Sequence, residues 1–219
     1  MPCNEKAVLW DMDGVIVDTS EFHFLSWKET WAKHGIDYSE TDFKLGFGRR
    51  NDEIIREVLG KKFKQSTYEA ITKAKEAAFR RLVKGHIKAL PGAIELLSAL
   101  DASGFLQALV SSTPSENIDV IIGGLKLARC FKTIISGYDV TEGKPSPQGY
   151  LLAAKRLDVL PSACVVLEDA IAGVEAARSG GMKCIAVTTT HPKTKLKAAD
   201  LIVDSLEKVN VSVIKKLVR

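Results

Sequence analysis

The chain has 219 residues, of which 46% are hydrophobic, and this is enough for a substantial core in one domain with a smaller inserted module. An intrinsically disordered chain is therefore excluded. Lysine and arginine number 31 against 27 aspartate and glutamate residues, and the net charge of +4 without a long basic stretch argues against a nucleic-acid-binding protein. The apolar runs are far shorter than a membrane span, so no membrane partner is expected.

The cysteines predict a protein without disulfides. Cys3, Cys130, Cys164 and Cys184 show no metal-type spacing, and the last two lie in apolar, strand-like runs where a buried thiol is expected. Residues 1–6 lack the apolar core of a signal peptide. We therefore expect a soluble protein in the reducing cytoplasm.

Short β-branched apolar runs alternate with helix-like segments along the chain. The runs cover residues 7–10, 106–110, 133–135, 164–167, 184–187 and 201–203. This alternation predicts an α/β protein with a parallel sheet covered by helices. The long interval between the first and second runs contains helix-like segments and no strand, which predicts an inserted helical domain.

The insert is predicted to contain three helices. Two of them cover residues 20–34 and 51–59 and end at glycines. Ser66 and Glu69 have the spacing of a capping box, which predicts that a long helix begins at Ser66 and ends near Gly85. The predicted domains are a core and an inserted helical domain, residues 1–18 with 87–219 and residues 19–86.

Two carboxylates follow the first predicted strand. Asp11 and Asp13 precede Gly14, and this glycine favours a tight turn that would bring both carboxylates toward one point. The end of a strand places them at the carboxyl edge of the sheet, where open α/β sheets bind ligands. A divalent cation would offset their repulsion, whereas the alternative interpretation is a solvated acidic turn.

A second acidic pair, Glu168 and Asp169, follows the strand predicted at residues 164–167. Hard oxygen ligands from two strand ends suit Mg²⁺. Acids at the N-terminus of a following helix would also explain the pair, and the two interpretations are compatible.

Hydroxyl groups follow the strand predicted at residues 106–110. Ser111 and Ser112 come first, and a helix is predicted to open with Thr113 as its N-cap and Glu116 closing a capping box. Strand-end hydroxyls beside the amides of a helix N-terminus suit an anion.

Lys144 follows the third predicted strand on a loop stiffened by Pro145 and Pro147, where its charge would be held in a restricted position unless it is simply solvated. Aspartates, a hydroxyl, a lysine and an acidic pair thus follow four successive strands. This order and spacing resembles the haloacid dehalogenase superfamily over nearly the whole chain. The matching residues are Asp11, Asp13, Ser111, Lys144, Glu168 and Asp169.

The resemblance implies a three-layer, Rossmann-like α/β core with strand order 5-4-1-2-3 and an inserted helical cap. It also implies that Asp11 attacks phosphorus to form an aspartyl phosphate, and that Asp13 is the general acid and then the general base. Mg²⁺ would be bound by Asp11, the Asp13 backbone carbonyl and Asp169, with Glu168 acting through water or as an orienting residue. Ser111 and Lys144 would hold the transferring oxygens.

The helical insert resembles the mobile cap of the phosphoglucomutase-like and sugar-phosphatase branch. In that branch, residues matching Thr19, His23, Arg49 and Lys75 bind the far end of the substrate and couple cap closure to Asp13; Ser112 is a further predicted substrate contact. An alternative remains for His23, because His23, Trp27 and Trp31 form a helical stripe typical of a small core. We interpret both tryptophans as packing residues.

The expected function is a phosphatase that hydrolyses a small phosphorylated metabolite such as a sugar phosphate. The alternative within enzymes is a β-phosphoglucomutase, which passes the same phosphoryl group to a sugar hydroxyl. Dehalogenation is disfavoured because halide release needs no acid such as Asp13. A catalytically silent binding protein is disfavoured because Asp11, Lys144 and Asp169 are also present. We expect a monomer or weak homodimer.

Overall fold

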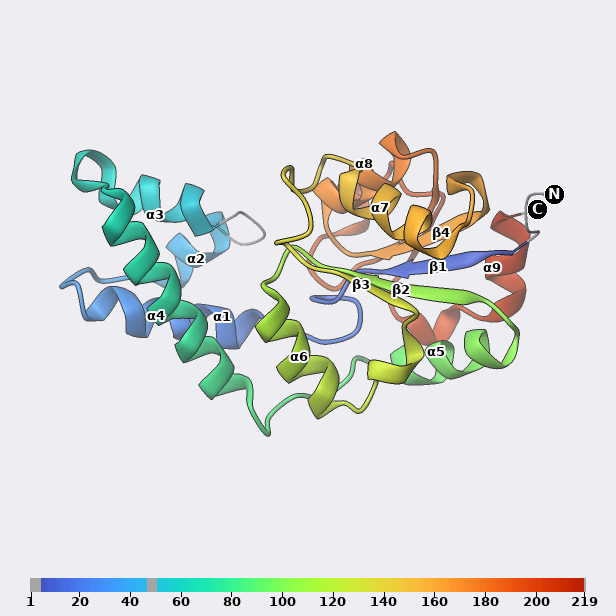
Figure 1. The fold of residues 1–219 in the computed structure, drawn as a ribbon, viewed down its shortest axis with the longest axis horizontal. Helices are drawn as coiled ribbons and strands as arrows, with labels where there is room; N and C mark the ends of the chain where they lie inside the picture. The colour runs from blue at the N-terminus through green and yellow to red at the C-terminus, as the bar shows by residue number, and fades with distance from the viewer. Residues whose placement is uncertain (1–4, 47–50, 219) are drawn as a thin grey trace. The chain divides into compact units, whose positions relative to one another are not determined.

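The computed structural model describes residues 5–46 and 51–218. The chain divides into two compact units (Figure 1). The sheet unit comprises Met1–Asp18 and Lys88–Arg219, and the helical unit comprises Thr19–Ile87. Each unit has its own apolar core.

The sheet unit is built on six parallel strands in the order β3-β2-β1-β4-β5-β6. The strands are β1 (Ala7–Trp10), β2 (Leu106–Val110), β3 (Thr133–Ile135), β4 (Cys164–Glu168), β5 (Lys183–Val187) and β6 (Leu201–Val203). The predicted order 5-4-1-2-3 is confirmed, and β6 extends the sheet beyond β5. The central position of β1, between β2 and β4, makes the first and fourth strands direct neighbours.

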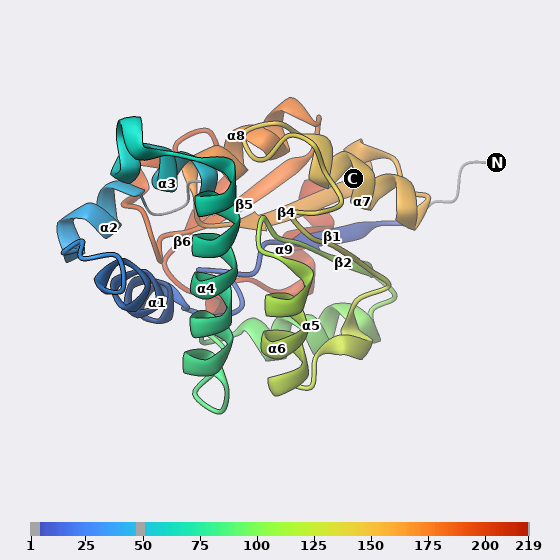
Figure 2. The same cartoon turned by 60° about the vertical axis from the view of Figure 1, so that its left-hand side comes forward.

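Helices cover both faces of this sheet. In both views α7 (Gln148–Leu157) and α8 (Ile171–Ser179) lie on one face, and the remaining helices of the sheet unit lie on the other (Figures 1 and 2). Those helices are α5 (Ala93–Ala102), α6 (Ser115–Gly124) and α9 (Val211–Leu217). The central strands β1 and β4 are buried along their whole length, which explains why they are continuous apolar runs without alternation.

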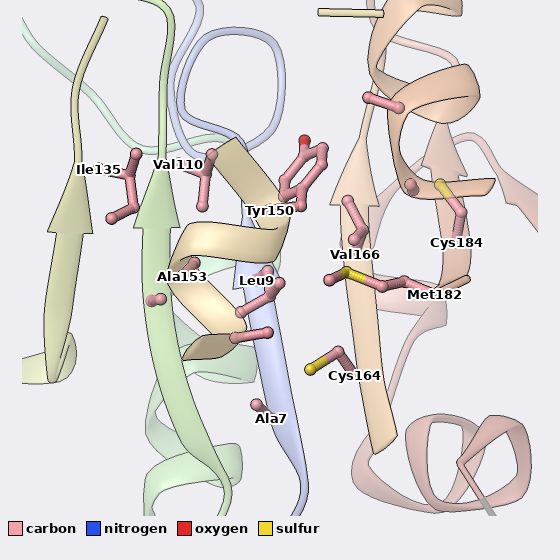
Figure 3. Packing of buried hydrophobic residues seen from close by; sticks show 14 of the residues in the cluster. Ala7, Leu9, Val110, Ile135, Tyr150, Ala153, Cys164, Val166, Met182 and Cys184 are labelled. Atoms are coloured by element: carbon pink, nitrogen blue, oxygen red, sulfur yellow. The ribbon is translucent and has the colours of Figure 1, made fainter. Parts of the chain in front are cut away.

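The core beneath α7 and α8 is formed by small and branched side chains. Tyr150 and Ala153 of α7 face Leu9, Val110 and Val166 of the sheet (Figure 3). These side chains are 3% exposed or less, so α7 is held firmly against the strands at its N-terminal turn. That turn directly follows the loop that carries Lys144.

The helical unit contains α1 (Ser20–Ala32), α2 (Glu40–Gly46), α3 (Asn51–Leu59) and α4 (Gln65–Val83), with a 3₁₀ turn at Gly60–Lys62. Trp27 and Trp31 are 2% and 0% exposed, and their stacked rings lie 5.5 Å apart. The rings pack with Ile55 and Ile71 in the core of this unit, as predicted for both tryptophans. Among the described residues, no helix has the length and apolar character needed to cross a bilayer.

In the helical unit one local prediction is wrong and one helix was missed. Helix α4 begins at Gln65 rather than Ser66, and its N-cap residue, Lys64, makes no side-chain capping bond. The reciprocal bonds of a capping box occur instead ahead of α2, where the Ser39 amide donates to Asp42 Oδ2 (2.8 Å) and the Asp42 amide donates to Ser39 Oγ (3.2 Å). Helix α2 was not predicted, although this Ser-x-x-Asp pattern marks its start.

Candidate active site

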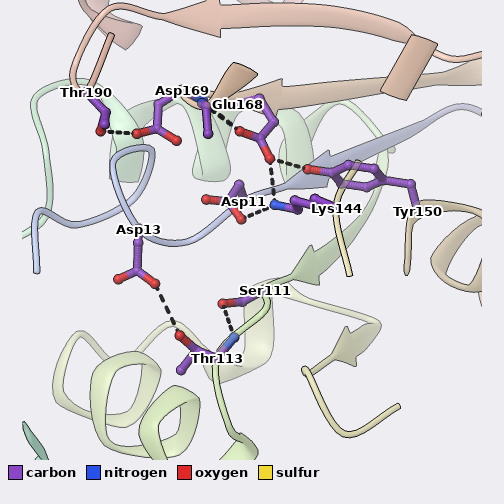
Figure 4. Close-up of polar contacts among 10 residues, drawn as sticks. Asp11, Asp13, Ser111, Thr113, Lys144, Tyr150, Glu168, Asp169 and Thr190 are labelled. Atoms are coloured by element: carbon purple, nitrogen blue, oxygen red, sulfur yellow. Dashed lines mark hydrogen bonds and ion pairs between the residues drawn. The ribbon is translucent and has the colours of Figure 1, made fainter. Parts of the chain in front are cut away.

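The predicted motif residues of the sheet unit meet at the carboxyl edge of the sheet (Figure 4). The Asp11 amide donates to the Leu167 carbonyl (3.0 Å), so the pairing of β1 with β4 continues to Asp11. The Ser111 amide likewise donates to the Ile135 carbonyl (2.9 Å). Because all strands are parallel, each side chain that follows a strand emerges at the same edge.

Three buried carboxylates lie together at this edge. Asp11, Glu168 and Asp169 each place one oxygen within 4.8 Å of the others, and the residues are 8%, 0% and 3% exposed. Burial, reinforced by the neighbouring carboxylates, raises the pKa of Asp11 well above its usual range. Burial and the Glu168 carboxylate raise the pKa of Asp169 to about 7. A divalent cation with oxygen ligands would relieve this excess of negative charge, and the donor set fits Mg²⁺.

Lys144 provides the positive charge within the acidic cluster. Its Nζ contacts Asp11 Oδ1 and Glu168 Oε1, and its side chain is 16% exposed. Burial alone would lower the pKa of Lys144, but the two carboxylates outweigh it and raise the pKa. The protonated, positively charged form of Lys144 is therefore favoured beside Asp11.

The loop that carries Lys144 is fixed on both sides. Before the lysine, Asp139 accepts from the Ser136 amide (2.9 Å) and hydroxyl (2.7 Å) and from Arg156 (2.7 Å), and these bonds lower its pKa to about 2. After the lysine, Gln148 Oε1 accepts from two loop amides at 3.0 and 2.8 Å. The loop is thus held independently of the contacts that Lys144 itself makes.

Each carboxylate oxygen of Glu168 accepts from two donors. Oε2 accepts from the two amides that open the turn into α8, each at 2.9 Å, and Oε1 accepts from Lys144 and from the Tyr150 hydroxyl (2.8 Å). A carboxylate has about four acceptor positions. A Cβ at Gly173 would lie 1.7 Å from Oε1, so α8 also packs directly on this carboxylate. Burial alone would raise the pKa of Glu168, but Lys144 and the hydrogen bonds outweigh it and lower the pKa.

Asp169 is held by two neighbours that follow different strands. Thr190, in the loop after β5, donates its hydroxyl to Asp169 Oδ2. Gly14 has a φ of +81°, and a Cβ there would lie 1.9 Å from the same oxygen. Only glycine accommodates both the left-handed backbone and this close approach, which explains its place in the turn after Asp13.

Asp13 faces the end of β2. Its Oδ2 accepts from the Thr113 hydroxyl at 3.4 Å, and the Thr113 amide donates to Ser111 Oγ at 3.2 Å. Because Ser111 Oγ accepts from this amide, its own hydrogen can be donated to another group, such as an anion. Thr113 is not the N-cap that we predicted, because α6 begins one residue later behind Pro114, and its hydroxyl contacts Asp13 instead.

Sequence analysis missed three hydroxyl residues of this cluster: Thr113 as a neighbour of Asp13, Tyr150 and Thr190. The sequence pattern around Tyr150 indicates a core position of α7, and Thr190 is one of three consecutive threonines. Nothing in their local sequence shows which carboxylate each one meets, because those contacts join segments that are distant along the chain.

The predicted substrate-binding residues fall in both units. Ser112 is exposed beside Ser111 and borders a pocket that is also lined by Ser136, Lys144 and Tyr150. Thr19 is the buried N-cap residue of α1 in the helical unit. Arg49 lies outside the described residues.

His23 and Lys75 contact each other within the helical unit. His23 Nδ1 lies 3.0 Å from Lys75 Nζ, and its ring stacks on Phe79 at 4.1 Å. Lys75 is 2% exposed and also donates to Glu76 at 2.9 Å. Burial and the Lys75 charge lower the pKa of His23 well below its usual range, so its ring is neutral at pH 7.

The chain matches the haloacid dehalogenase-like hydrolase family over residues 8–187. The chain belongs to this family. It is 31% identical to the chloroplastic 5-amino-6-(5-phospho-D-ribitylamino)uracil phosphatase of Arabidopsis thaliana, with 99% of this chain aligned to 59% of that protein. It is 30% identical to the validoxylamine A 7'-phosphate phosphatase of Streptomyces hygroscopicus subsp. limoneus, over 93% of this chain and 95% of that protein.

A β-phosphoglucomutase from Bacillus subtilis is 32% identical, over 90% of this chain and 88% of the mutase. Among solved structures, the family IA, variant 3 hydrolase of Entamoeba histolytica superposes with a TM-score of 0.89 at 30% identity, covering 97% of this chain and 99% of that one. The predicted superfamily and the predicted enzyme class, a phosphoric monoester hydrolase of that superfamily, are confirmed.

Proposed function

We propose that this chain is a magnesium-dependent phosphatase that hydrolyses a small phosphorylated metabolite, in particular a sugar phosphate, through a phosphorylated Asp11. The observation that carries the proposal is the convergence of Asp11, Lys144 and Asp169 at the carboxyl edge of the sheet. Two of the relatives support it, since both are phosphatases whose names describe phosphorylated small molecules.

In the first half of the proposed reaction, an Asp11 carboxylate oxygen attacks phosphorus and the bond from phosphorus to the ester oxygen breaks. Asp13 gives its proton to the departing oxygen. In the second half, water gives a proton to Asp13 and attacks phosphorus, and the bond to Asp11 breaks. Inorganic phosphate leaves, and both aspartates return to their starting states.

Ser111 and Lys144 would bind the oxygens of the transferring phosphoryl group. Lys144 has three donor hydrogens, and the carboxylates of Asp11 and Glu168 engage two of them. Its remaining donor and the Ser111 hydroxyl would therefore be directed at an anion bound beside Asp11. Fixed donors in a buried site stabilise the charge that develops on these oxygens in the transition state.

Mg²⁺ would be held by Asp11, Asp169 and the Asp13 backbone carbonyl, and it would supply further neutralisation of phosphoryl charge. Thr190 and Gly14 support Asp169 in this role by their contacts with one of its oxygens. Glu168 was predicted among the metal-binding residues, through water or as an orienting residue. Because its acceptor positions are taken, we assign it the orienting role, exerted on Lys144.

We further propose that the helical unit is the cap domain and selects the substrate. Thr19, His23, Arg49 and Lys75 would bind the part of the substrate away from the scissile bond, and Ser112 would contact it from the sheet unit. The contact between the half-buried His23 and the buried Lys75 supports this, because it brings an imidazole and an ammonium, two groups that suit a phosphorylated sugar, together in one unit.

A second candidate is a β-phosphoglucomutase activity, which the Bacillus subtilis relative of that name supports. In that case the paired His23 and Lys75 would couple closure of the cap to Asp13. A mutase needs the same residues around Asp11, and it differs in delivering the phosphoryl group to a sugar hydroxyl rather than to water. The test supplies β-glucose 1-phosphate with a trace of glucose 1,6-bisphosphate. We expect free phosphate with little glucose 6-phosphate; near-complete conversion to glucose 6-phosphate would establish the mutase instead.

The phosphatase itself is tested with p-nitrophenyl phosphate and a panel of sugar phosphates, in Mg²⁺ and in excess chelator. We expect phosphate release that requires Mg²⁺ and reaches its highest kcat/KM on one class of sugar phosphate. A pure, folded protein that releases no phosphate from any of these compounds in Mg²⁺ would overturn the proposal.

A further inference from the structure

We propose that Tyr150 is a positioning residue, which sets the place of the Lys144 ammonium through Glu168 and thereby controls phosphate binding. The inference rests on the proposed function, because it assigns Lys144 to the phosphoryl group. Tyr150 lies on α7, outside the four motifs, and approaches the acidic cluster from the apolar core (Figures 3 and 4).

Tyr150 contacts both partners of the buried ion pair. Its hydroxyl donates to Glu168 Oε1 at 2.8 Å, and the centre of its ring lies 5.1 Å from Lys144 Nζ. The residue is 1% exposed, so its ring and hydroxyl are largely shielded from water. The ring lies within cation–π distance of the Lys144 ammonium. The Tyr150 hydroxyl and this ammonium both donate to Glu168 Oε1.

The shared oxygen explains why the hydroxyl matters. Lysine ends in a flexible four-carbon chain, and its ammonium takes the position that its partners define. Oε1 of Glu168 divides its acceptor capacity between Lys144 and Tyr150. Without the hydroxyl, Oε1 would hold Lys144 more strongly, and the ammonium would move toward Glu168 and away from Asp11 and the phosphoryl group.

The ring and the hydroxyl have separable roles. Packing against Ala153, Val166 and the other residues of this core requires an aromatic ring, and phenylalanine would fill the same volume. The hydroxyl adds no apolar contact, and it donates a hydrogen bond to Glu168. If Tyr150 served only the core, its replacement by phenylalanine would therefore change little except the stability of the protein.

The experiment compares the Tyr150→Phe variant with the wild-type protein and with Tyr138→Phe. Tyr138 is 68% exposed in the same connection between β3 and α7, so its variant is the matched control. We expect Tyr150→Phe to lower kcat/KM for p-nitrophenyl phosphate about tenfold, which corresponds to one hydrogen bond to a charged group. Its dissociation constant for inorganic phosphate should rise by a similar factor in calorimetric titrations.

The Mg²⁺ concentration that gives half-maximal activity should stay unchanged, because Asp169 and its contact with Thr190 are not touched. Tyr138→Phe should behave as wild type in all three measurements. Wild-type phosphate affinity in Tyr150→Phe, with or without a lower melting temperature, would return Tyr150 to a packing role. An inactive wild-type protein would overturn the proposed function itself, so the two failures are distinguishable.

Discussion

The Asp169→Asn substitution tests whether the acidic cluster is built for a cation. Asparagine has the same shape and still offers an oxygen to the Thr190 hydroxyl, but it carries no charge. The pKa of Asp169 is raised in the folded protein from 3.8 to about 7, which corresponds to at most about 4 kcal/mol of lost stability once the carboxyl is ionised. The substitution should recover much of this free energy when no metal is bound.

The sign of the pH dependence follows from the raised pKa. Between pH 3.8 and about 7, the folded metal-free protein holds a proton on Asp169 that the unfolded chain has released. Its free energy of unfolding therefore decreases as the pH rises through this window and then levels off. The variant lacks this titration, so its stability advantage over wild type should be small near pH 4 and largest above pH 7.

Thermal unfolding in chelator at pH 5 and pH 8, and again in Mg²⁺, measures both effects. For a chain of this size about 4 kcal/mol corresponds to roughly 8–16 °C in Tm, and this is the upper limit expected at pH 8. Mg²⁺ should raise the Tm of wild type and leave that of the variant nearly unchanged. A variant less stable than wild type at pH 8 in chelator, or equal stabilisation of both by Mg²⁺, would refute the reasoning.

Substitutions at three further positions test single residue roles. Asp13→Ala should slow turnover, and with an aryl phosphate it should give a burst and a longer-lived phosphoenzyme, since the good leaving group needs less acid; wild-type steady turnover would contradict this role. Gly14→Ala should lower both Tm and Mg²⁺ affinity, because its φ is +81° and the new methyl group would meet Asp169; an unchanged Mg²⁺ affinity would exclude the contact. Thr190→Val should weaken Mg²⁺ binding about tenfold in direct titrations while Thr190→Ser retains it; equal loss in both variants would indicate a packing role.

The strands and their order were predictable because the physical signal is strong. A strand buried on both faces must be a continuous apolar run, and the six predicted runs differ from the observed strands by at most one residue at an end. The carboxyl ends of parallel strands share one edge, so residues that follow the strands, such as Asp11 and Lys144, were expected to meet. Their approach in the structure agrees with that expectation.

Helix starts and cross-chain contacts were harder to predict. The Ser-x-x-Glu pattern at Ser66 forms no cap, whereas the Ser-x-x-Asp pattern from Ser39 to Asp42 does, and local sequence alone does not show which of the two will cap a helix. The contacts of Tyr150 and Thr190 depend on how α7 and the loop after β5 meet the end of β4. Such meetings follow from the packing of the whole sheet unit rather than from any segment of it.

The central claim is that Asp11 carries the phosphoryl group, and rapid acid quenching of a reaction with a ³²P-labelled sugar phosphate tests it most directly. The account predicts an enzyme-bound label that is released by hydroxylamine, maps to the peptide containing Asp11 and requires Mg²⁺. The Asp11→Asn variant, with a wild-type melting profile, should show neither label nor turnover. Turnover by a folded Asp11→Asn variant, or a label on any other residue, would contradict the account.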